Sequence, residues 1–392
     1  MIIDAHVHYT PPSLKARLHT LADSEPYWHL LLNPPTGKSI QAWSTAERMI
    51  HNMDATGIDK IVLVGEYFRQ HENCVQRNNQ AIDIINRWPD RVLALATIQP
   101  NAGSAALAEL DRCIDNGLVG VGELNPYAQG FHLDDDNFLK LADRCIDHDI
   151  PINLHVSEEI GGYYLGKSTT PLRSYYELAC QRPDLKLILA HWGGGLFLYE
   201  IMPRVRRQLH SVWYDTAATP LLYPVDKIFA TALTCIDHRK LLHGSDYPLR
   251  IYPRTMKEAN FRPFLATMDQ LPLDEETRAD IMGRNAARLF GLLKNSGKNP
   301  EGNGVDHRAA LKPISPAEPS PASTILPMTS IGGLLDTWPE TEEILGQFGI
   351  RTRDVAAPKW EPLQQIAAAK GMSRSELEKL IEALNTILLD AN

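Results

Sequence analysis

The sequence lacks the features that mark membrane, secreted and nucleic-acid-binding proteins. No apolar run reaches the length of a transmembrane helix, and the N-terminus shows neither the charged segment nor the apolar core of a signal peptide. Basic residues are not in excess, because the formal net charge is −9. That balance disfavours nucleic acid as a partner and a polybasic contact with a membrane. We therefore expect a cytoplasmic protein with neither kind of partner.

Cysteine is also scarce. The 392 residues include 5 cysteines, an odd number, and no two of them form a Cys-x-x-Cys pair. This usage indicates reduced thiols rather than disulfides or a cysteine-ligated cluster. The apolar content of 44% and the charged content of 22% are typical of a globular protein. The length suits two or three domains, or one large barrel with an appendage.

Short apolar runs recur over residues 1–293, each followed by a longer segment of helical character. Several are continuously rich in Ile, Leu and Val, as in parallel strands that are buried on both faces. Eight such units predict an α/β fold, a (β/α)8 TIM barrel, with an open doubly wound sheet as the alternative. We favour the barrel because polar residues collect at the C-terminal ends of at least five runs, which a barrel brings to one mouth. The runs span residues 2–6, 60–65, 91–98, 118–124, 150–156, 185–191, 212–217 and 240–246.

The first of these units is unusually long, because residues 9–59 separate the first two runs. A helix is predicted within residues 44–59, with Ser44 and Glu47 forming its capping box. The irregular part before this helix is either a lid that faces the substrate or a surface insertion.

The barrel is expected to fill residues 1–293, and a different composition follows it. Residues 294–324 lack apolar periodicity and are rich in Pro, Gly, Ser and Asn, which predicts a flexible linker. Residues 325–392 predict a small all-α domain, with helices that stop at Gly349 and Gly371. Ser373 and Glu376 form a capping box for its last helix.

Histidines at strand ends are the strongest indication of chemistry. His6 and His8 share one face of an extended strand, and two converging imidazoles suit a metal site, although such a pair alone is more often structural. The signal becomes specific because His155, His191 and Asp246 also stand at the C-terminal ends of predicted strands. In a barrel these side chains reach one cavity, and the set suits Zn2+ or another divalent transition metal.

Four short motifs contain these residues: DAHVH at 4–8, LH at 154–155, AHWGG at 190–194 and GSDYP at 244–248. Together they resemble the amidohydrolase superfamily, and within it the branch typified by aminocarboxymuconate semialdehyde decarboxylase. The resemblance covers residues 1–293. It implies one or two divalent ions, most commonly Zn2+, with His6, His8, His155 and Asp246 as ligands. It also implies that His191 polarises the substrate or manages a proton.

Glu123 ends the fourth predicted strand, where binuclear members of the superfamily often carry a carboxylated lysine. A glutamate at the similar position bridges two metals in nuclease-like relatives. The resemblance therefore admits Glu123 as a further metal ligand. It is alternatively a hydrogen-bond partner that orients a histidine, or a substrate contact.

Further residues follow strand ends and are candidates for substrate contacts. Tyr127, Tyr247 and Arg250 fall at such positions, and the forked guanidinium of Arg250 suits a carboxylate. His243 lies three residues before Asp246, so its side chain is expected to point away from the ligand side and to pack. The glycines at 193–195 either let the backbone approach a substrate or form a tight turn.

The C-terminal segment resembles a small helical domain of unknown function that is often found beside redox or iron–sulfur proteins. The resemblance rests on residues 328–350 and 363–385. Members often carry a cysteine at the position where this chain continues with Arg351. We therefore expect an interaction or oligomerisation module, through which the chain forms a homo-oligomer or binds a protein partner.

Two reactions fit this set of residues. The first is hydrolysis of a small-molecule amide, lactone or ester, because a divalent ion activates water and polarises a carbonyl. Asp246 would then carry the proton of the water, and His191 would donate to the developing oxyanion. The alternative is non-oxidative decarboxylation of a small carboxylic acid, which Arg250 beside a substrate carboxylate would favour. A barrel kept only as a binding platform is disfavoured by the intact ligand set.

Overall fold

The computed structural model describes residues 1–34, 39–162 and 164–293, together with 325, 329, 331, 334–335, 338–350 and 363–390. The chain divides into two compact units, Met1–Leu293 and Lys294–Asn392. The predicted linker, residues 294–324, and the segment that begins at Arg351 lie outside the described residues.

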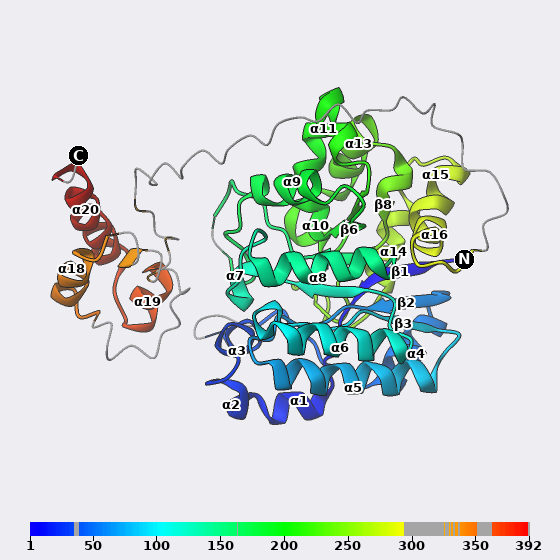
Figure 1. The fold of residues 1–392 in the computed structure, drawn as a ribbon, viewed down its shortest axis with the longest axis horizontal. Helices are drawn as coiled ribbons and strands as arrows, with labels where there is room; N and C mark the ends of the chain where they lie inside the picture. The colour runs from blue at the N-terminus through cyan, green and yellow to red at the C-terminus, as the bar shows by residue number, and fades with distance from the viewer. Residues whose placement is uncertain are drawn as a thin grey trace. The chain divides into compact units, whose positions relative to one another are not determined.

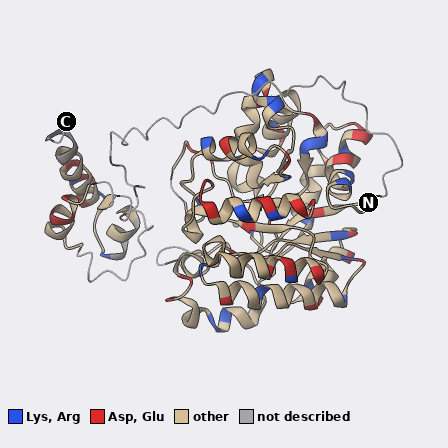
Figure 2. Cartoon of the chain, viewed as in Figure 1, with Lys and Arg blue, Asp and Glu red and all other residues tan. Residues whose placement is uncertain are grey.

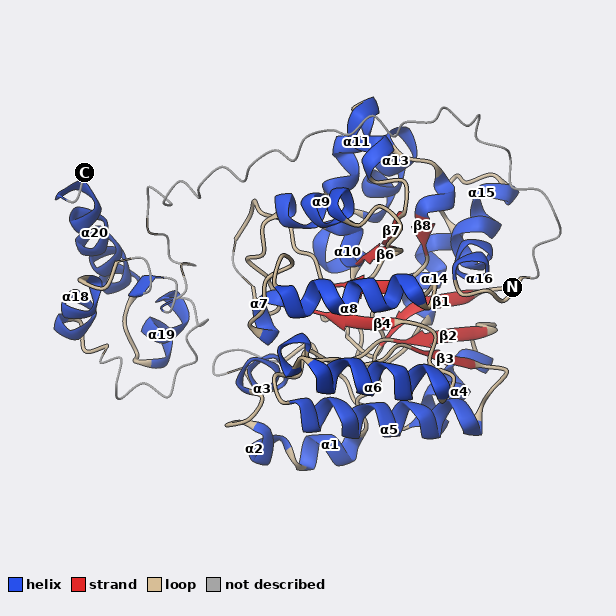
Figure 3. Cartoon of the chain, viewed as in Figure 1, coloured by secondary structure: helices blue, strands red, loops and turns tan. Residues whose placement is uncertain are grey.

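Each of the eight predicted apolar runs overlaps a β-strand, so that prediction is confirmed (Figure 3). The strands are short, and helices separate them in the sequence. Their bounds are β1 Ile3–Val7, β2 Lys60–Leu63, β3 Val92–Ala94, β4 Val121–Leu124, β5 Ile152–Leu154, β6 Leu187–Leu189, β7 Val212–Asp215 and β8 Leu241–Leu242.

The strands pair in parallel with their neighbours in the sequence. One sheet has the order β1-β2-β3, and the other has the order β4-β5-β6-β7-β8. Two isolated parallel bridges connect the sheets: Ala96, just after β3, pairs with Val121, and Val7 pairs with Tyr247, just after β8. The strands therefore follow the cyclic order of the predicted (β/α)8 barrel rather than that of a doubly wound sheet.

Helices lie on the outside of the strands (Figure 1). Alternate residues of β2 show the two faces, because Ile61 and Leu63 pack in the large apolar cluster with helix residues, whereas Val62 belongs to a smaller separate cluster. The main helices of this unit are α4 Ala46–Asp54, α5 His71–Arg87, α6 Ser104–Asp115, α8 Asp136–Asp147, α9 Leu172–Gln181, α11 Pro203–Gln208, α13 Val225–Cys235, α14 Arg262–Asp269, α15 Glu275–Ala279 and α16 Asn285–Leu289.

Shorter helical segments complete the connections. They are α7 Pro126–Gln129, α10 Ala190–Gly193, α12 Thr219–Leu222, the 3-10 turns Pro100–Ala102, Leu196–Ile201 and His238–Lys240, and a π-helical turn at Asp280–Arg284. The glycines after His191 form a tight turn here. A Cβ on Gly194 would lie 2.4 Å from the carbonyl oxygen of Ser157, so only glycine fits at that point.

The start of α4 differs by one residue from the expectation. Thr45, not Ser44, is the N-cap, and its hydroxyl accepts a hydrogen bond from the N–H of Arg48 at 3.2 Å. The hydroxyl of Ser44 instead accepts from the hydroxyl of Tyr247 at 2.7 Å. The predicted capping box of Ser44 and Glu47 is therefore wrong, because Ser44 is engaged in a tertiary contact.

The long first connection folds into helices α1 Pro12–Ala16, α2 Leu18–Leu21 and α3 Pro26–Leu32. Leu21, Trp28 and Leu32 pack with Phe68 and Cys74 in a separate apolar cluster. The buried carboxylate of Glu25 accepts hydrogen bonds from the N–H groups of Arg69 at 2.6 Å and Gln70 at 3.0 Å, where α5 begins. These contacts anchor the connection to the segment that follows β2.

The C-terminal unit contains helices α18 Thr341–Gln347, α19 Leu363–Ala369 and α20 Arg374–Asp390 around a small apolar core. The predicted capping box is confirmed, because the N–H of Ser373 donates to the carboxylate of Glu376 at 2.7 Å and the N–H of Glu376 donates to the hydroxyl of Ser373 at 3.3 Å. Gly349 and Gly371 follow α18 and α19 with positive φ, as helix stops.

Charged side chains of both signs are interspersed along the helices, as Figure 2 shows for α8. Among the described residues, no helix combines the length and the apolar character that crossing a membrane requires.

The two units make a first prediction. Residues 1–293 have their own core, so a chain truncated after Leu293 should fold and unfold cooperatively. We expect its melting temperature to lie within about 2 °C of the corresponding transition of the full chain. Differential scanning calorimetry of both proteins checks this. Aggregation of the truncated chain, or loss of its transition, would show that the C-terminal unit is part of the same cooperative fold.

Candidate metal centre

Side chains from distant segments meet at one end of the barrel. All but one are buried, and the side chain of His8 is 14% exposed. They come from β1 and the residue after it, from β4, and from the ends of β5, β6 and β8. The six residues are His6, His8, Glu123, His155, His191 and Asp246.

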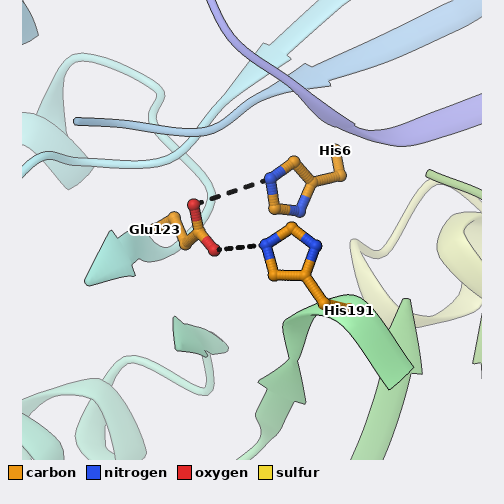
Figure 4. Close-up of side chains that lie close together, drawn as sticks. All are labelled: His6, Glu123 and His191. Atoms are coloured by element: carbon orange, nitrogen blue, oxygen red, sulfur yellow. Dashed lines mark ion pairs between the residues drawn. The ribbon is translucent and has the colours of Figure 1, made fainter. Parts of the chain in front are cut away.

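Glu123 is the residue that contacts most of this cluster, and Figure 4 shows one of its oxygens facing His6 and the other facing His191. Its Oε1 is 2.9 Å from Nδ1 of His155 and 3.4 Å from Nε2 of His191. Its Oε2 is 3.6 Å from Nε2 of His6 and also 3.6 Å from Nε2 of His8. One carboxylate thus faces four imidazoles.

Asp246, which follows the last strand of the barrel, approaches two of these imidazoles. Its Oδ1 is 3.5 Å from Nε2 of His8 and 3.9 Å from Nε2 of His6. Two groups of three residues therefore have the spacing of metal ligands, and they share His6. The groups are His6, His8 and Asp246, and His6, Glu123 and His191.

The outward nitrogens of three imidazoles are occupied. Nδ1 of His6 is 2.8 Å from Oδ2 of Asp215. Nε2 of His155 is 2.9 Å from the carbonyl oxygen of Gly166, and Nδ1 of His191 is 3.2 Å from the carbonyl oxygen of Ala217. An oxygen without a proton can only accept, so each outward nitrogen carries the N–H. In each neutral ring the inward nitrogen therefore carries a lone pair and no proton.

These inward lone pairs face one another. The inward nitrogens of His155 and His191 are 3.2 Å apart, and those of His6 and His8 are 3.3 Å apart. Neutral acceptors at such distances, with a buried carboxylate between them, need a proton or a cation to balance them. The residues present therefore fit a divalent metal ion of borderline softness.

The pKa values show the same demand for positive charge. Burial alone would lower the pKa of His6, but the carboxylates of Asp215 and Glu123 raise it to about 10. Burial acts on His191 in the same sense, but its hydrogen bond to Glu123 raises its pKa to about 9. Burial would raise the pKa of Glu123, yet the neighbouring His155 and His6 hold it well below its ordinary value. The cluster thus holds protons where a cation would otherwise sit.

Asp215, at the end of β7, is a residue that the sequence did not single out. Besides its contact with His6, its Oδ1 accepts hydrogen bonds from the N–H groups of His191 at 2.9 Å and Ala217 at 3.0 Å. It thereby fixes both the ring of His6 and the backbone of the turn that carries His191. Its signal in the sequence was its place at the end of the seventh apolar run.

Tyr67, after β2, was also missed. Its hydroxyl donates to Oε2 of Glu123 at 2.9 Å and lies 3.3 Å from Nδ1 of His155. Its ring centroid is 6.2 Å from that of Tyr27 on α3, which in turn is 5.8 Å from that of Tyr127. Through these ring contacts the long first connection reaches the cluster. The rings of Tyr27, Tyr67 and Tyr127 form one wall beside it.

Two of the residues predicted to touch a substrate make other contacts. The ring of Tyr247 stacks on Phe261 at 4.1 Å, and its hydroxyl donates to Ser44. The guanidinium of Arg250 donates to the carbonyl oxygens of Ser39 and Ile40. Arg250 also lines a surface cavity of about 600 Å³ beside the long first connection. None of the contacts in the described part of the chain joins Arg250 to the six-residue cluster.

Comparison with known proteins places this arrangement in context. No curated protein matches the chain. Among solved structures, 5-carboxyvanillate decarboxylase from Novosphingobium aromaticivorans, complexed with manganese and 4-hydroxy-3-methoxy-5-nitrobenzoic acid, superposes with a TM-score of 0.59 at 17% identity, covering 74% of this chain and 96% of that chain. The 2,6-dihydroxybenzoate decarboxylase from Rhizobium superposes with a TM-score of 0.53 at 19% identity, covering 74% and 98%.

A third structure, 4-oxalomesaconate hydratase from Rhodopseudomonas palustris, gives a TM-score of 0.51 at 17% identity, covering 74% of this chain and 96% of that chain. These similarities concern the fold. The family profile described as Amidohydrolase matches residues 3–292, which is most of the barrel unit and most of the chain. With a parallel barrel whose rim gathers four histidines and two carboxylates, the chain belongs to the amidohydrolase family of metal-dependent enzymes.

Proposed function

We propose that this enzyme hydrolyses a small-molecule amide, lactone or ester with the help of a divalent cation. The observation that carries the proposal is that ring nitrogens and carboxylate oxygens gather in two overlapping groups that share His6, one with His8 and Asp246 and the other with Glu123 and His191. Such donors bind a cation, and a divalent cation supplies Lewis-acid polarisation of a carbonyl and lowers the pKa of a water molecule toward neutrality.

His6, His8, His155 and Asp246 would hold the ion. Glu123 contacts the inward nitrogens, the atoms that would themselves bind the ion, so it fits the role of a ligand better than that of an orienting partner. Asp215 fills the orienting role at an outward nitrogen. The two overlapping groups of donors suit one or two ions. Zn2+ matches the nitrogen-rich set, and the manganese in the Novosphingobium structure makes Mn2+ the other ion to test.

Asp246 and His191 would each have a different role in handling protons. The side chain of Asp246 is 5% exposed and that of Glu123 is fully buried, so Asp246 is the carboxylate that a water molecule can reach. It would take the proton of the attacking water and pass it to the leaving group. His191, whose Nε2 faces the cluster 3.4 Å from Oε1 of Glu123, would donate a hydrogen bond from a protonated ring to the oxygen on which negative charge develops.

Non-oxidative decarboxylation of a small carboxylic acid is the second candidate. The observation that favours it is the fold similarity to two decarboxylases of aromatic acids. On this route Asp246 would deliver a proton to the carbon that loses carbon dioxide, and no water molecule would attack. Arg250 contacts Ser39 and Ile40 rather than the six-residue cluster, so this candidate is proposed here without Arg250 as its support.

A substrate screen distinguishes the two reactions. The metal-loaded enzyme would be incubated with panels of amides, lactones, esters and aromatic carboxylic acids in water enriched in oxygen-18. Hydrolysis places the heavy oxygen in the product acid, whereas decarboxylation releases carbon dioxide and leaves a product without it. Heavy oxygen in a product acid supports the first proposal. Release of carbon dioxide without it replaces that proposal with the second.

A second prediction concerns Asp215. Replacing it by Asn removes the carboxylate that holds the N–H of His6, and we expect divalent-ion affinity to fall about 10–100-fold with the fold retained. Competition with a coloured chelator measures the affinity. Glu109→Gln is a matched control, because Glu109 is also a buried carboxylate held by hydrogen bonds, but it lies on α6. Unchanged affinity in Asp215→Asn would contradict the orienting role.

A third prediction follows from the raised pKa values. Below about pH 9, His6 and His191 hold protons in the metal-free cluster, and a cation must displace those on its ligands. Affinity for Zn2+ should therefore weaken as the pH falls, by about tenfold per pH unit for each displaced proton. Calorimetry in buffers of different ionisation enthalpy counts the released protons. A dissociation constant that does not change between about pH 6.5 and about pH 8.5 would refute this linkage.

A further inference from the structure

The first and last strands are irregular where they carry ligands. The register between β1 and β2 shifts between Asp4 and Val7, the stretch that contains His6. β8 ends at Leu242, four residues before Asp246, which itself has a φ of 64°. Regular ladder hydrogen bonds therefore cannot by themselves hold these two segments in place, and other groups must pair their backbone donors.

One oxygen of Asp4 pairs two of these donors. Its Oδ1 accepts the N–H of His6 at 3.2 Å and the N–H of Ser245 at 3.0 Å. His6 and the residue after Ser245, Asp246, are both candidate ligands. The neighbouring bonds run between the same segments: the N–H of Asp246 donates to the carbonyl oxygen of His6 at 3.0 Å, and the N–H of His8 donates to that of Tyr247 at 2.6 Å.

The surroundings of Asp4 suggest that a contribution to stability alone does not explain an aspartate at this buried position. Asp4 is fully buried, and its Oδ2 has no hydrogen-bond partner among the described residues. The imidazole of His243 lies beside it, with Nε2 4.0 Å from Oδ2, but burial lowers the pKa of His243 and so favours the neutral ring. The ring of His243 packs on Phe264, as the sequence predicted. Both ring nitrogens of His243 also lack hydrogen-bond partners in the described structure. Buried polar groups left in this state cost free energy.

We propose that Asp4 is a positioning residue, whose Oδ1 fixes segment 5–8 against segment 243–247 and so sets the separation of His6, His8 and Asp246. Asp4 touches no atom that would bind a cation or a substrate in the described contacts. It acts through the two N–H groups, and what matters is an acceptor oxygen at that point rather than a negative charge. The inference about ligand geometry rests on the proposed metal centre, and the inference about the two segments does not.

Two variants of the full chain separate the acceptor from the charge. Asp4→Asn keeps an oxygen at the position of Oδ1 and loses the charge, whereas Asp4→Leu keeps the branch at Cγ but places larger methyl groups where the two oxygens were. We expect Asp4→Leu to bind Co2+ at least about tenfold more weakly than the wild type and to change its visible absorption spectrum. Asp4→Asn should keep the wild-type spectrum and an affinity within about threefold.

Hydrogen exchange of the metal-free proteins supplies a readout that needs no ion. Peptides that cover residues 1–9 and 240–250 should exchange faster in Asp4→Leu and at the wild-type rate in Asp4→Asn. Glu200→Gln is the matched control, because Glu200 is a buried carboxylate held by Lys240 and Tyr214 outside the cluster. It should not change the Co2+ spectrum or exchange in residues 1–9, and any change that it causes in the second peptide should be confined to the surroundings of Lys240, its ion-pair partner.

The outcomes decide separately for the two proposals. Wild-type exchange in a folded Asp4→Leu, or equal effects of Leu and Asn, would overturn the role of Asp4. A wild type that binds no Co2+ would overturn the metal centre, while the exchange data would still decide whether Asp4 holds the two segments. If Asp4→Leu does not fold, Asp4→Ser replaces it, since its shorter side chain should also fail to reach both N–H groups and should show the same faster exchange.

Discussion

The site depends on lone pairs that are forced to face one another. Three imidazoles have their outward N–H groups held by Asp215, the carbonyl of Gly166 and the carbonyl of Ala217. Since the tautomers are set from outside, the inward nitrogens have no protons of their own to share. Two carboxylates then add negative charge to a buried space. Only positive charge balances this arrangement, and that requirement explains both the raised pKa of His6 and the fit to a divalent ion.

The barrel makes this geometry possible because the six members of the cluster come from five different strands, of which only β1 supplies two, His6 and His8. No single loop has to hold four imidazoles together. The parallel strands deliver the side chains to one rim, and backbone carbonyls from the following loops orient the rings. The tight turn at Gly194, pressed against Ser157, keeps the loops after β5 and β6 in contact. His155 stands at the start of the loop after β5, and His191 stands at the start of the loop after β6. The packing of these two loops therefore affects the distance between the ring nitrogens of the two histidines.

Much of this was predictable from the sequence, and the exceptions have physical causes. The eight strands were evident because buried parallel strands are continuously apolar, and the histidines were evident because they follow such runs. Asp215 also follows a run, but one carboxylate at a strand end carries no pattern that separates an orienting residue from a surface one. Tyr67 was missed because a single tyrosine after a strand likewise carries no pattern that identifies a role in a site. The direction of the Arg250 side chain depends on where a loop turns, which the sequence does not reveal, and here the guanidinium donates to Ser39. The cap of α4 moved to Thr45 because a distant hydroxyl, that of Tyr247, bonds to Ser44.

The same reasoning explains why the donor set identifies a chemistry more readily than a substrate. Imidazoles and carboxylates at a barrel rim define where a cation can polarise an oxygen, and hydrolysis and decarboxylation both use that polarisation. What separates them is whether water reaches the reacting carbon, and that is decided by the walls of the site. Here the described wall includes the rings of Tyr27, Tyr67 and Tyr127, of which Tyr27 comes from the long first connection. That connection is bound to the start of α5 through Glu25, and its Tyr27 packs against Tyr67, whose hydroxyl donates to Glu123. The donor set itself is compatible with either reaction, and the side chains that line it on this side come in part from the long first connection.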